Sequence, residues 1–470
     1  MTKAVELPLW LFALIVLFAA VTFASHFLFP SVRWYFRRRL ERAVAQLNQR
    51  LDRPIQPFKL TRRFDMIQRI IYNPQVSQAI ADHARAEGIP ENVAFQQARR
   101  YAREIVPSFS ASLYFGVAIR AARFLSNALY HVRLRQLDEP ALRAIDPEAT
   151  VVFVMNHRSN MDYVLVTYLA ADRSALAYAV GEWAQVWPLS RLIRAMGAYF
   201  IRRRSRNDLY RAVLACYVRL ATGAGVTQAM FPEGGLSLTG GLMPAKLGLL
   251  KYITAGFDPE GRDVVFVPVA LNYDRVLEDR ILIAASMGTG RCFNARIGVI
   301  AGHVLRQLWL WLTGRYRRFG DAVVTFGPPL SLRALRAERS GDVTEVLADR
   351  LMRRIADGVP VLPVPLVAWL LQTHGAMTRA EIDARAAAAL ASLPASTVGR
   401  LCADPHAATG AGLRALSRQG ALRQDQGRYV PDAQGGDLLR FYANSIRHLM
   451  PGDVPGNGLG AEPEAAPGDG

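Results

Sequence analysis

A histidine and an aspartate stand five positions apart in the segment NHRSNMD, residues 156–162. The segment follows TVVFV, a run of β-branched and aromatic residues that is typical of a buried strand. A histidine at a strand end can accept a proton near neutral pH, and a nearby carboxylate can fix its tautomer and stabilise its charged form. His157 and Asp162 are therefore the candidate catalytic residues.

The same spacing also has a purely structural interpretation. Ser159 and Asp162 have the spacing of a capping box, in which the hydroxyl and the carboxylate satisfy free amides in the first turn of a helix. A helical stretch, YVLVTYLAA, follows immediately at residues 163–171. Either role suits Asp162, so the pair alone is a weak motif.

Two further blocks carry groups that could bind an anionic substrate. GAYFIRR, residues 197–203, ends in Arg202 and Arg203, and guanidinium groups match phosphate oxygens in bidentate geometry. FPEGG, residues 231–235, offers the Glu233 carboxylate to a hydroxyl, and its glycines allow the backbone to approach a ligand. Ordinary alternatives exist, because a basic run is often solvated and Pro-Glu-Gly is a common turn.

The elements that must position these residues form an alternating pattern. Strand-like runs interleave with helical stretches at residues 148–335; the runs are TVVFVM, VTQAMF, DVVFVPVAL and DAVVTFG. This alternation predicts an α/β domain with a largely parallel or mixed sheet. Residues 31–147 and 336–450 have helical spacing, so we expect a helical region before the domain and a helical domain after it. His157 then lies at the carboxyl end of a strand, where open α/β sheets place ligands.

Composition and the N-terminus indicate a membrane surface. Hydrophobic residues make up 51% of the chain and the formal charge is +18, as in proteins that meet phospholipid, nucleic acid or phosphorylated substrates. Residues 7–29 carry no charge, which predicts a transmembrane anchor within residues 1–30, with a cleaved signal peptide as the alternative. The arginine-rich segment 33–39 follows, so the positive-inside rule predicts a single-pass protein of the inner (cell) membrane with its catalytic domain in the cytoplasm.

The cysteines and the C-terminal end give smaller indications. Cys216, Cys292 and Cys402 show no CxxC spacing, so we expect neither a disulfide framework nor a zinc site. Three cysteines without such a pattern predict a reducing compartment. Residues 451–470 are rich in proline, glycine and acidic residues, so we expect a disordered tail.

Taken in order, four blocks resemble the motifs of the glycerolipid acyltransferase family. The family motifs are HxxxxD, G-x-x-F-I-R-R, F-x-E-G and an apolar V-P-V block, here VPVALNY at residues 267–273. HRSNMDYVLVTY and MGAYFIRR are most similar to the membrane-bound glycerol-3-phosphate and dihydroxyacetone-phosphate acyltransferases. The resemblance covers residues 110–335 well and is weaker beyond, where LLRFYANSIRHL is similar to the ending of those enzymes.

This resemblance implies a reaction and a set of roles. His157 would take the proton from a glycerol hydroxyl as it attacks an acyl thioester, and Asp162 would orient the imidazole. The implied activity is glycerol-3-phosphate 1-O-acyltransferase, with acyl-CoA or acyl carrier protein as co-substrate, membrane lipids as neighbours, and no cofactor or metal. The substrate-binding residues that it implies are Arg158, Arg202, Arg203, Glu233, Gly234, Gly235 and Ser237.

One departure from the family pattern leaves the acceptor open. The third block commonly reads E-G-x-R-S-R, whereas Leu236 and Leu238 stand at the two arginine positions here. The phosphate would then be bound by the arginines of the second block, or by Lys246 or Lys251. Otherwise the acceptor is 1-acylglycerol 3-phosphate or another lipid headgroup, or the domain is an inactive membrane scaffold.

The C-terminal region carries signals of a different kind. Thr378 and Glu381 have the spacing of a capping box, and LRALSRQGALRQDQGRYV predicts a helix and then a hairpin that turns at residues 425–427. Together they indicate a winged-helix-like unit. Nucleic-acid binding would suit such a shape, but the turn is acidic and aromatic residues are sparse, so we expect none.

Overall fold

The computed structural model describes residues 8–18, 42, 48–49, 54–60, 63–170, 176–181, 189–202, 207–288, 318–432 and 435–451. The chain divides into two compact units, and the second, Gln56–Ala171 with Ala175–Gly470, holds the fold described below. The first unit is Met1–Ile55 with Asp172–Ser174. Among the described residues, no helix by itself has both the length and the apolar composition of a membrane span. The bent pair Thr344–Gly358 and Pro363–His374 has that length and composition only when the two helices are taken together.

Several predictions concern residues that lie partly or wholly outside the described ranges. Of the predicted anchor, residues 1–30, the structure describes residues 8–18, which include the apolar helix Leu9–Phe18, and residues 1–7 and 19–30 lie outside the described part of the chain. The same holds for Cys292 and for the predicted tail beyond residue 451. The anchor and the tail stay predictions.

A mixed sheet forms the centre of the second unit, with the strand order β1-β7-β6-β2-β5-β3-β4 and with β8 paired to β6. Neighbouring strands are parallel except where β7 and β8 pair antiparallel with β6. The strands are β1 His131–Gln136, β2 Thr150–Met155, β3 Ala177–Gly181, β4 Tyr199–Ile201, β5 Gln228–Met230, β6 Val264–Tyr273, β7 Asp321–Phe326 and β8 Leu330–Ser331. The mixed α/β sheet with helical flanks, expected from the sequence, is confirmed.

The strength of the apolar pattern in each strand explains which strands were predicted. β2 and β6 are buried along their whole length, as near-continuous apolar runs covered on both faces should be. The four predicted runs correspond to β2, β5, β6 and β7. β1, HVRLRQ, lies in the stretch for which the sequence predicted helices, because this edge strand is largely exposed and pairs only with β7.

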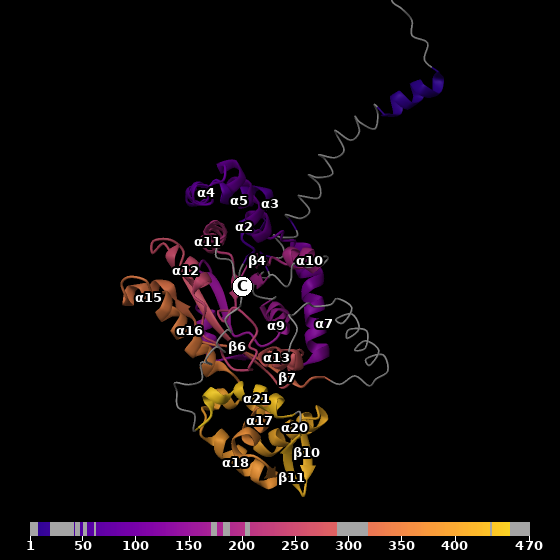
Figure 1. Cartoon of the computed structure of the whole chain (residues 1–470), viewed down its shortest axis with the longest axis vertical. Coiled ribbons are helices and arrows are strands. Elements are labelled where there is room, and N and C mark those ends of the chain that lie inside the picture. Colours follow the sequence, from indigo (N-terminus) through magenta and orange to yellow (C-terminus); the bar gives the residue numbers. More distant parts are fainter. Residues whose placement is uncertain are drawn as a thin grey trace, which may run out of the picture. The chain divides into compact units, whose positions relative to one another are not determined.

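Helices cover the two faces of the sheet (Figure 1). α7 and α9 pack together on one face, and α15 and α16 pack along β6 on the other. The helices in and around the sheet are α7 Ile119–Leu129, α8 Glu139–Arg143, α9 Met161–Ala170, α10 Leu189–Ala195, α11 Asp208–Gly223, α12 Gly248–Ala255, α13 Asp279–Ser286, α15 Leu332–Glu338 and α16 Thr344–Gly358.

Of the helices that precede the sheet, α5 packs mainly through small residues, whereas α3 and α4 also bury isoleucines. α5 buries Ala94, Ala98 and Ala102, spaced four apart, and packs against α4 and α11. These elements are α2 Pro57–Leu60, α3 Arg63–Ile71, α4 Pro74–Glu87, α5 Glu91–Ile105, α6 Ala111–Leu113 and a π-helical turn at Tyr114–Ala118.

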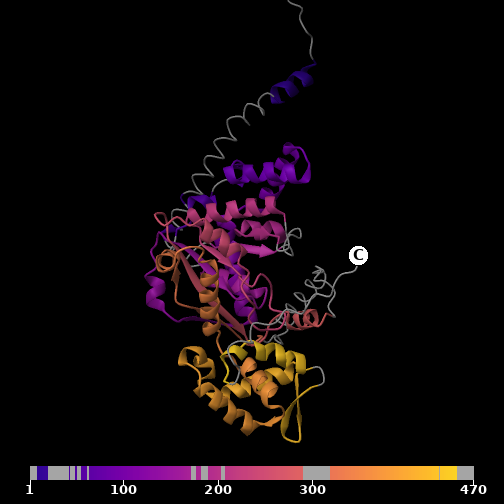
Figure 2. The same cartoon turned by 60° about the vertical axis from the view of Figure 1, so that its left-hand side comes forward.

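The C-terminal region adds helices and a small sheet with the order β10-β11-β9 (Figure 2, orange and yellow). Thr378 and Glu381 form the predicted capping box, and the predicted hairpin turns at Gln426 and Gly427, both with positive φ. The elements are α17 Pro363–His374, β9 Met377–Thr378, α18 Arg379–Ala391, α19 Ala395–Val398, α20 Pro405–Arg418, β10 Leu422–Asp425, β11 Arg428–Pro431 and α21 Gly436–Asn444, with 3-10 turns at Arg400–Cys402 and Arg447–Leu449. Kinship with winged helices stays a prediction.

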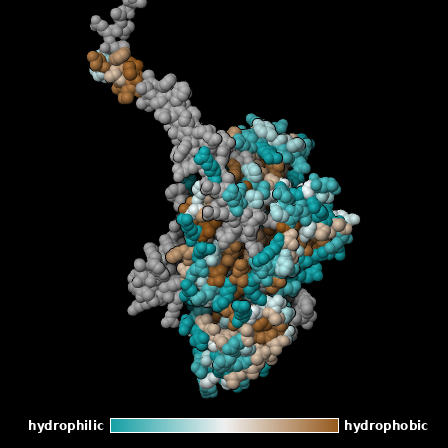
Figure 3. All heavy atoms as spheres, turned by 180° about the vertical axis from the view of Figure 1, so that it is seen from behind, coloured by the Kyte–Doolittle hydropathy of each residue, from teal (hydrophilic) through white to brown (hydrophobic). Residues whose placement is uncertain are grey.

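The core runs through both the α/β part and the C-terminal region. α17 is buried over most of its length, and it packs against α20 and α21. The face shown in Figure 3 is mostly hydrophilic, with hydrophobic residues in patches between hydrophilic ones. Because one continuous core joins the two parts, the C-terminal elements can influence the loops of the sheet.

Candidate active site

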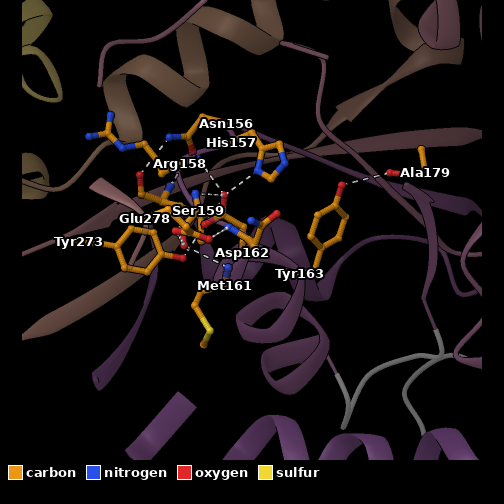
Figure 4. Close-up of polar contacts among 12 residues, drawn as sticks. Asn156, His157, Arg158, Ser159, Met161, Asp162, Tyr163, Ala179, Tyr273 and Glu278 are labelled. Carbon is orange, nitrogen blue, oxygen red and sulfur yellow. Dashed lines mark hydrogen bonds and ion pairs between the residues drawn. The ribbon is translucent and has the colours of Figure 1, made fainter. Parts of the chain in front are cut away.

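His157 and Asp162 form a buried pair at the carboxyl end of β2 (Figure 4). His157 Nδ1 lies 2.9 Å from Asp162 Oδ2, and the two side chains are 1% and 0% exposed. β2 ends at Met155 and α9 begins at Met161, so the loop between them carries the histidine and the first turn of the helix carries the aspartate. The sequence-predicted pair is thus within hydrogen-bonding distance.

Asp162 combines the two roles that the sequence left open. Its Oδ2 accepts hydrogen bonds from the backbone N–H groups of Arg158, at 2.7 Å, and Ser159, at 3.0 Å. Its Oδ1 accepts a hydrogen bond from the Tyr273 hydroxyl. One carboxylate therefore fixes the loop and also orients the His157 ring.

Aromatic side chains hold the His157 ring in place. Phe231 stacks on it with ring centroids 4.0 Å apart, and Tyr163 meets it edge-on at 5.3 Å. With Nδ1 directed at Asp162, Nε2 is the ring nitrogen left for a substrate, and it makes no hydrogen bond with any described residue. This geometry suits a general base whose proton-accepting atom is Nε2.

Glu233, from the third block, is buried close to the charge of Arg158. Burial raises the pKa of Glu233 to about 8, and the Arg158 charge opposes that rise. The backbone amides of His157 and Met243 also lower this pKa, but neither has hydrogen-bond geometry. Both carboxylate oxygens therefore lack a hydrogen-bond partner among the described residues.

Arg158 lies on the other side of the segment from the His157 ring (Figure 4). Its Nη1 donates a hydrogen bond to the Gly240 carbonyl, while Nε and Nη2 are buried without a partner in the described chain. Burial lowers the pKa of Arg158 to about 10, against the charges of Glu233 and Asp162. Its predicted substrate contact stays a prediction.

The rest of the third block is tied to the backbone of His157. The Ser237 N–H donates to the His157 carbonyl at 3.0 Å, and the Ser237 hydroxyl donates to the Gly241 carbonyl. Gly234 has φ +71°, and the Lys246 side chain lies so close to it that an added Cβ would be 2.8 Å from Lys246 Cδ. Gly235 is the next residue, and the exposed Lys246 is the cation beside Gly234.

The two leucines at the family's arginine positions differ in environment. Leu236 packs against the core, whereas Leu238 is 38% exposed. Of the two lysines that the sequence offered as substitutes, Lys251 is on α12, where its charge acts on Asp342. Lys246 is therefore the better placed of the two for a ligand at the third block.

Arg202, predicted to bind the substrate, is bound to a carboxylate of the protein itself. Its Nη2 and Nε lie 2.6 and 2.9 Å from the two carboxylate oxygens of Glu104 on α5, a bidentate ion pair. The rings of Tyr101 and Tyr210 flank the guanidinium. A phosphate would have to compete with Glu104 for this arginine. Arg203 lies outside the described residues.

Sequence reasoning missed Tyr273, Glu278 and Phe231. Tyr273 ends the VPVALNY block and Phe231 begins FPEGG, so both stood in motifs but were not given roles. Glu278 belongs to no motif, yet its carboxylate accepts hydrogen bonds from the Ser159 hydroxyl, at 2.8 Å, and from the Asn160 N–H, at 3.0 Å. Only the folded chain brings it to the catalytic segment.

The described residues contain no group of three or more His, Cys, Asp or Glu side chains that could hold a metal ion. Cys216 and Cys402 are buried free thiols.

Comparisons with known proteins match two parts of the chain. Residues 136–272 match the acyltransferase family, and residues 308–451 match the glycerol-3-phosphate acyltransferase C-terminal region. A glycerol-3-phosphate acyltransferase of Pseudomonas putida KT2440 is 26% identical over 423 residues, which cover 83% of this chain and 49% of that protein. One of Ectopseudomonas mendocina is 27% identical over 422 residues, with the same two coverages.

These matches confirm the family resemblance that the four blocks predicted. The chain spans about half the length of the curated relatives that it matches. A solved 1-acyl-sn-glycerophosphate acyltransferase of Thermotoga maritima is more distant, with 16% identity and a TM-score of 0.32 over 52% of this chain and 75% of that one.

Proposed function

We propose that this chain, which carries an acyltransferase-family domain and the C-terminal region of glycerol-3-phosphate acyltransferases, acylates the sn-1 hydroxyl of glycerol 3-phosphate. The observation that carries the proposal is the buried His157–Asp162 pair at the end of β2, with Nε2 of the histidine left for a substrate. Acyl-CoA or acyl carrier protein would supply the acyl group, and lysophosphatidic acid would be the product.

The reaction needs no protein nucleophile. His157 Nε2 accepts the proton of the acceptor hydroxyl as its oxygen bonds to the thioester carbonyl carbon, and Asp162 stabilises the imidazolium. The carbon–sulfur bond then breaks, and the leaving thiolate takes the proton from His157. General-base help of this kind is worth about 10²- to 10⁴-fold in rate.

The third block would bind the acceptor. The Glu233 carboxylate, whose oxygens have no partner in the described chain, offers an acceptor to a second glycerol hydroxyl. Lys246, beside the Gly234 turn, and Arg203 offer cations to the phosphate. In this proposal Arg202 is bound to Glu104 and contributes structure instead of charge.

The N-terminal segment would hold the enzyme at its lipid products. The apolar helix Leu9–Phe18 and the arginine-rich segment 33–39 support a membrane anchor with the catalytic domain in the cytoplasm. Partners would then be membrane lipids and the two substrates, without nucleic acid.

A second acceptor is supported by a specific observation. Leu236 and Leu238 replace two cations of the family pattern, and Leu238 is partly exposed. An apolar chain beside the phosphate would suit them, which favours 1-acylglycerol 3-phosphate as acceptor and phosphatidic acid as product.

One assay tests these proposals together. Purified full-length protein in detergent is offered glycerol 3-phosphate, dihydroxyacetone phosphate or lysophosphatidate, each with acyl-CoA and with acyl carrier protein, and His157→Ala is the control. We expect the highest kcat/KM with glycerol 3-phosphate. Transfer to lysophosphatidate alone would favour the second acceptor, and no transfer above the His157→Ala background with any pair would overturn the proposed function.

A further inference from the structure

Residues 272–279, which we call the strap, run from the end of β6 to the start of α13 and contact the catalytic segment along one side. The Tyr273 hydroxyl donates to Asp162. The Glu278 carboxylate accepts from the Ser159 hydroxyl (Figure 4) and from the Asn160 N–H. Asp162 and the loop before it therefore owe part of their position to the strap.

Other residues of the strap contact the C-terminal region. The Tyr442 hydroxyl of α21 donates to Asp279 at 2.7 Å and accepts from the Val276 N–H at 3.1 Å. Asn272 donates to the Pro360 carbonyl at 2.9 Å. Asp274 accepts from the Val364 N–H at 3.1 Å, in the first turn of α17. The strap is thus bonded on one side to the catalytic segment and on the other to residues 360–442.

Helix α21 also meets the glycine turn beneath Arg158. Asn444 donates to the Thr239 carbonyl at 2.9 Å. At Gly240 an added Cβ would lie 1.9 Å from the Phe441 carbonyl oxygen, so only glycine allows this approach. Arg158 donates to the Gly240 carbonyl from the other side. Two loops that flank the catalytic pair therefore rest on the same helix.

Tyr442 is the contact through which this arrangement can be tested. Its side chain is fully buried, and its hydroxyl both donates and accepts. Removing the hydroxyl would leave the Val276 N–H and the Asp279 carboxylate without this partner, and a buried polar group that loses its partner favours a shifted structure. The shift would fall on the strap, between residues 276 and 279.

We propose that α21 positions the catalytic pair, with Tyr442 as a positioning residue that acts through the strap on Asp162 and residues 158–160. The inference rests on the proposed function for the reaction that it serves. It gives the C-terminal region a task in catalysis, because the strap adds hydrogen bonds to Asp162, Ser159 and Asn160 beyond those that Asp162 makes within the loop. Tyr442 touches neither His157 nor the third-block carboxylate, so its effect falls on turnover more than on substrate binding.

The experiment compares Tyr442→Phe with Tyr429→Phe, a control in β11 whose hydroxyl has no hydrogen bond within the described chain. We expect Tyr442→Phe to lower kcat about tenfold, as loss of a hydrogen bond to a charged group does, with both KM values within about twofold. Hydrogen exchange of the backbone over residues 157–162 should rise in Tyr442→Phe and stay at the wild-type rate in Tyr429→Phe.

A double-mutant cycle with Glu278→Gln tests the route of the effect. If Tyr442 acts through the strap, the loss from Tyr442→Phe should be smaller in the Glu278→Gln background than in the wild type. Asp279→Ala removes the partner of the same hydrogen bond and serves if Tyr442→Phe does not fold. Additive losses, or equal rises in both KM values with kcat unchanged, would overturn the proposal.

Hydrogen exchange separates this inference from the proposed function, since it needs no turnover. A protein inactive with all acceptors, but with faster exchange over residues 157–162 in Tyr442→Phe, would refute the function and keep the positioning role. Exchange that is unchanged in that segment would refute the positioning role, whatever the activity.

Discussion

Two buried ionisable pairs lie next to one another in this protein and differ in how they are held. His157 and Asp162 are hydrogen-bonded at 2.9 Å, and Asp162 accepts three further hydrogen bonds, two from backbone amides and one from Tyr273. The Arg158 charge favours the ionised form of Glu233, but burial outweighs it and raises the pKa of Glu233 to about 8, and neither Glu233 oxygen has a hydrogen-bond partner in the described chain.

The first pair is therefore held in a fixed geometry by hydrogen bonds, whereas Glu233 has oxygens that can still accept hydrogen bonds. A buried pair whose carboxylate has hydrogen bonds to both oxygens is held in one arrangement, which is what proton transfer at a fixed atom requires. A buried, uncharged carboxyl group without hydrogen-bond partners costs roughly 1 to 3 kcal/mol, and a ligand hydroxyl would relieve that cost. The first pair is therefore suited to chemistry, and Glu233 to binding. Four predictions test this comparison.

The largest effect should come from the first pair. His157→Ala and Asp162→Asn should each lower kcat by about 10²- to 10⁴-fold, because the general base is lost or no longer oriented. Steady-state kinetics measures this, and circular dichroism should show folded protein in both cases. Turnover near the wild-type rate in either variant would remove the assigned mechanism.

Tyr273→Phe should have the next largest effect. It removes one hydrogen bond to the Asp162 carboxylate and leaves the others, so we expect kcat to fall about 10- to 100-fold with acceptor KM little changed. Tyr72→Phe, at an exposed position, is the matched control. A rise in KM with kcat unchanged would show that Tyr273 serves binding, and the contrast between the two pairs would be lost.

Glu233→Gln should remove the pH dependence that the second pair imposes on stability. The pKa of Glu233 is raised from 4.5 to about 8 in the folded protein, so between these values the folded state binds more protons than the unfolded state. Wild-type stability should therefore fall relative to the variant by as much as about 1.4 kcal/mol per pH unit over that window.

Chemical unfolding in detergent from about pH 5 to about pH 8.5 measures this difference. Glu87→Gln, at an exposed carboxylate, should show no such trend. A stability difference between wild type and Glu233→Gln that stays constant with pH would mean that Glu233 is solvated or hydrogen-bonded, and the two pairs would no longer differ.

The smallest effect should come from Arg202, with its neighbour as the contrast. Arg202→Ala breaks a partly exposed ion pair with Glu104, so we expect a loss of about 1 kcal/mol or less in stability and an unchanged acceptor KM. Arg203→Ala should raise acceptor KM about tenfold if that residue holds the phosphate. Unfolding curves and acceptor titrations measure the two effects. If Arg202→Ala instead raises acceptor KM and Arg203→Ala does not, Arg202 must leave Glu104 and bind the substrate.

Local pattern predicted much of this protein from its sequence. The strands β2, β5, β6 and β7 were found because long apolar runs leave few alternatives to burial. The capping box at Thr378 and the turn at Gln426 and Gly427 depend on residues a few positions apart, so they were also predictable. His157 and Asp162 belong to this class, since one loop and one helical turn bring them together.

Contacts between residues far apart in the sequence could not be predicted, and only the tertiary structure shows them. Strand β1 forms because β7, about 190 residues later, offers it an edge, although its own sequence has no strong apolar pattern. Arg202 stands in a block for which the sequence predicted phosphate binding, but it forms an ion pair with Glu104 on α5, which no motif records. Tyr273, Glu278 and Tyr442 each bond to groups more than 100 residues away. The sequence determined which residues can do chemistry, and the packing of distant segments determined which of them are held in place and by what.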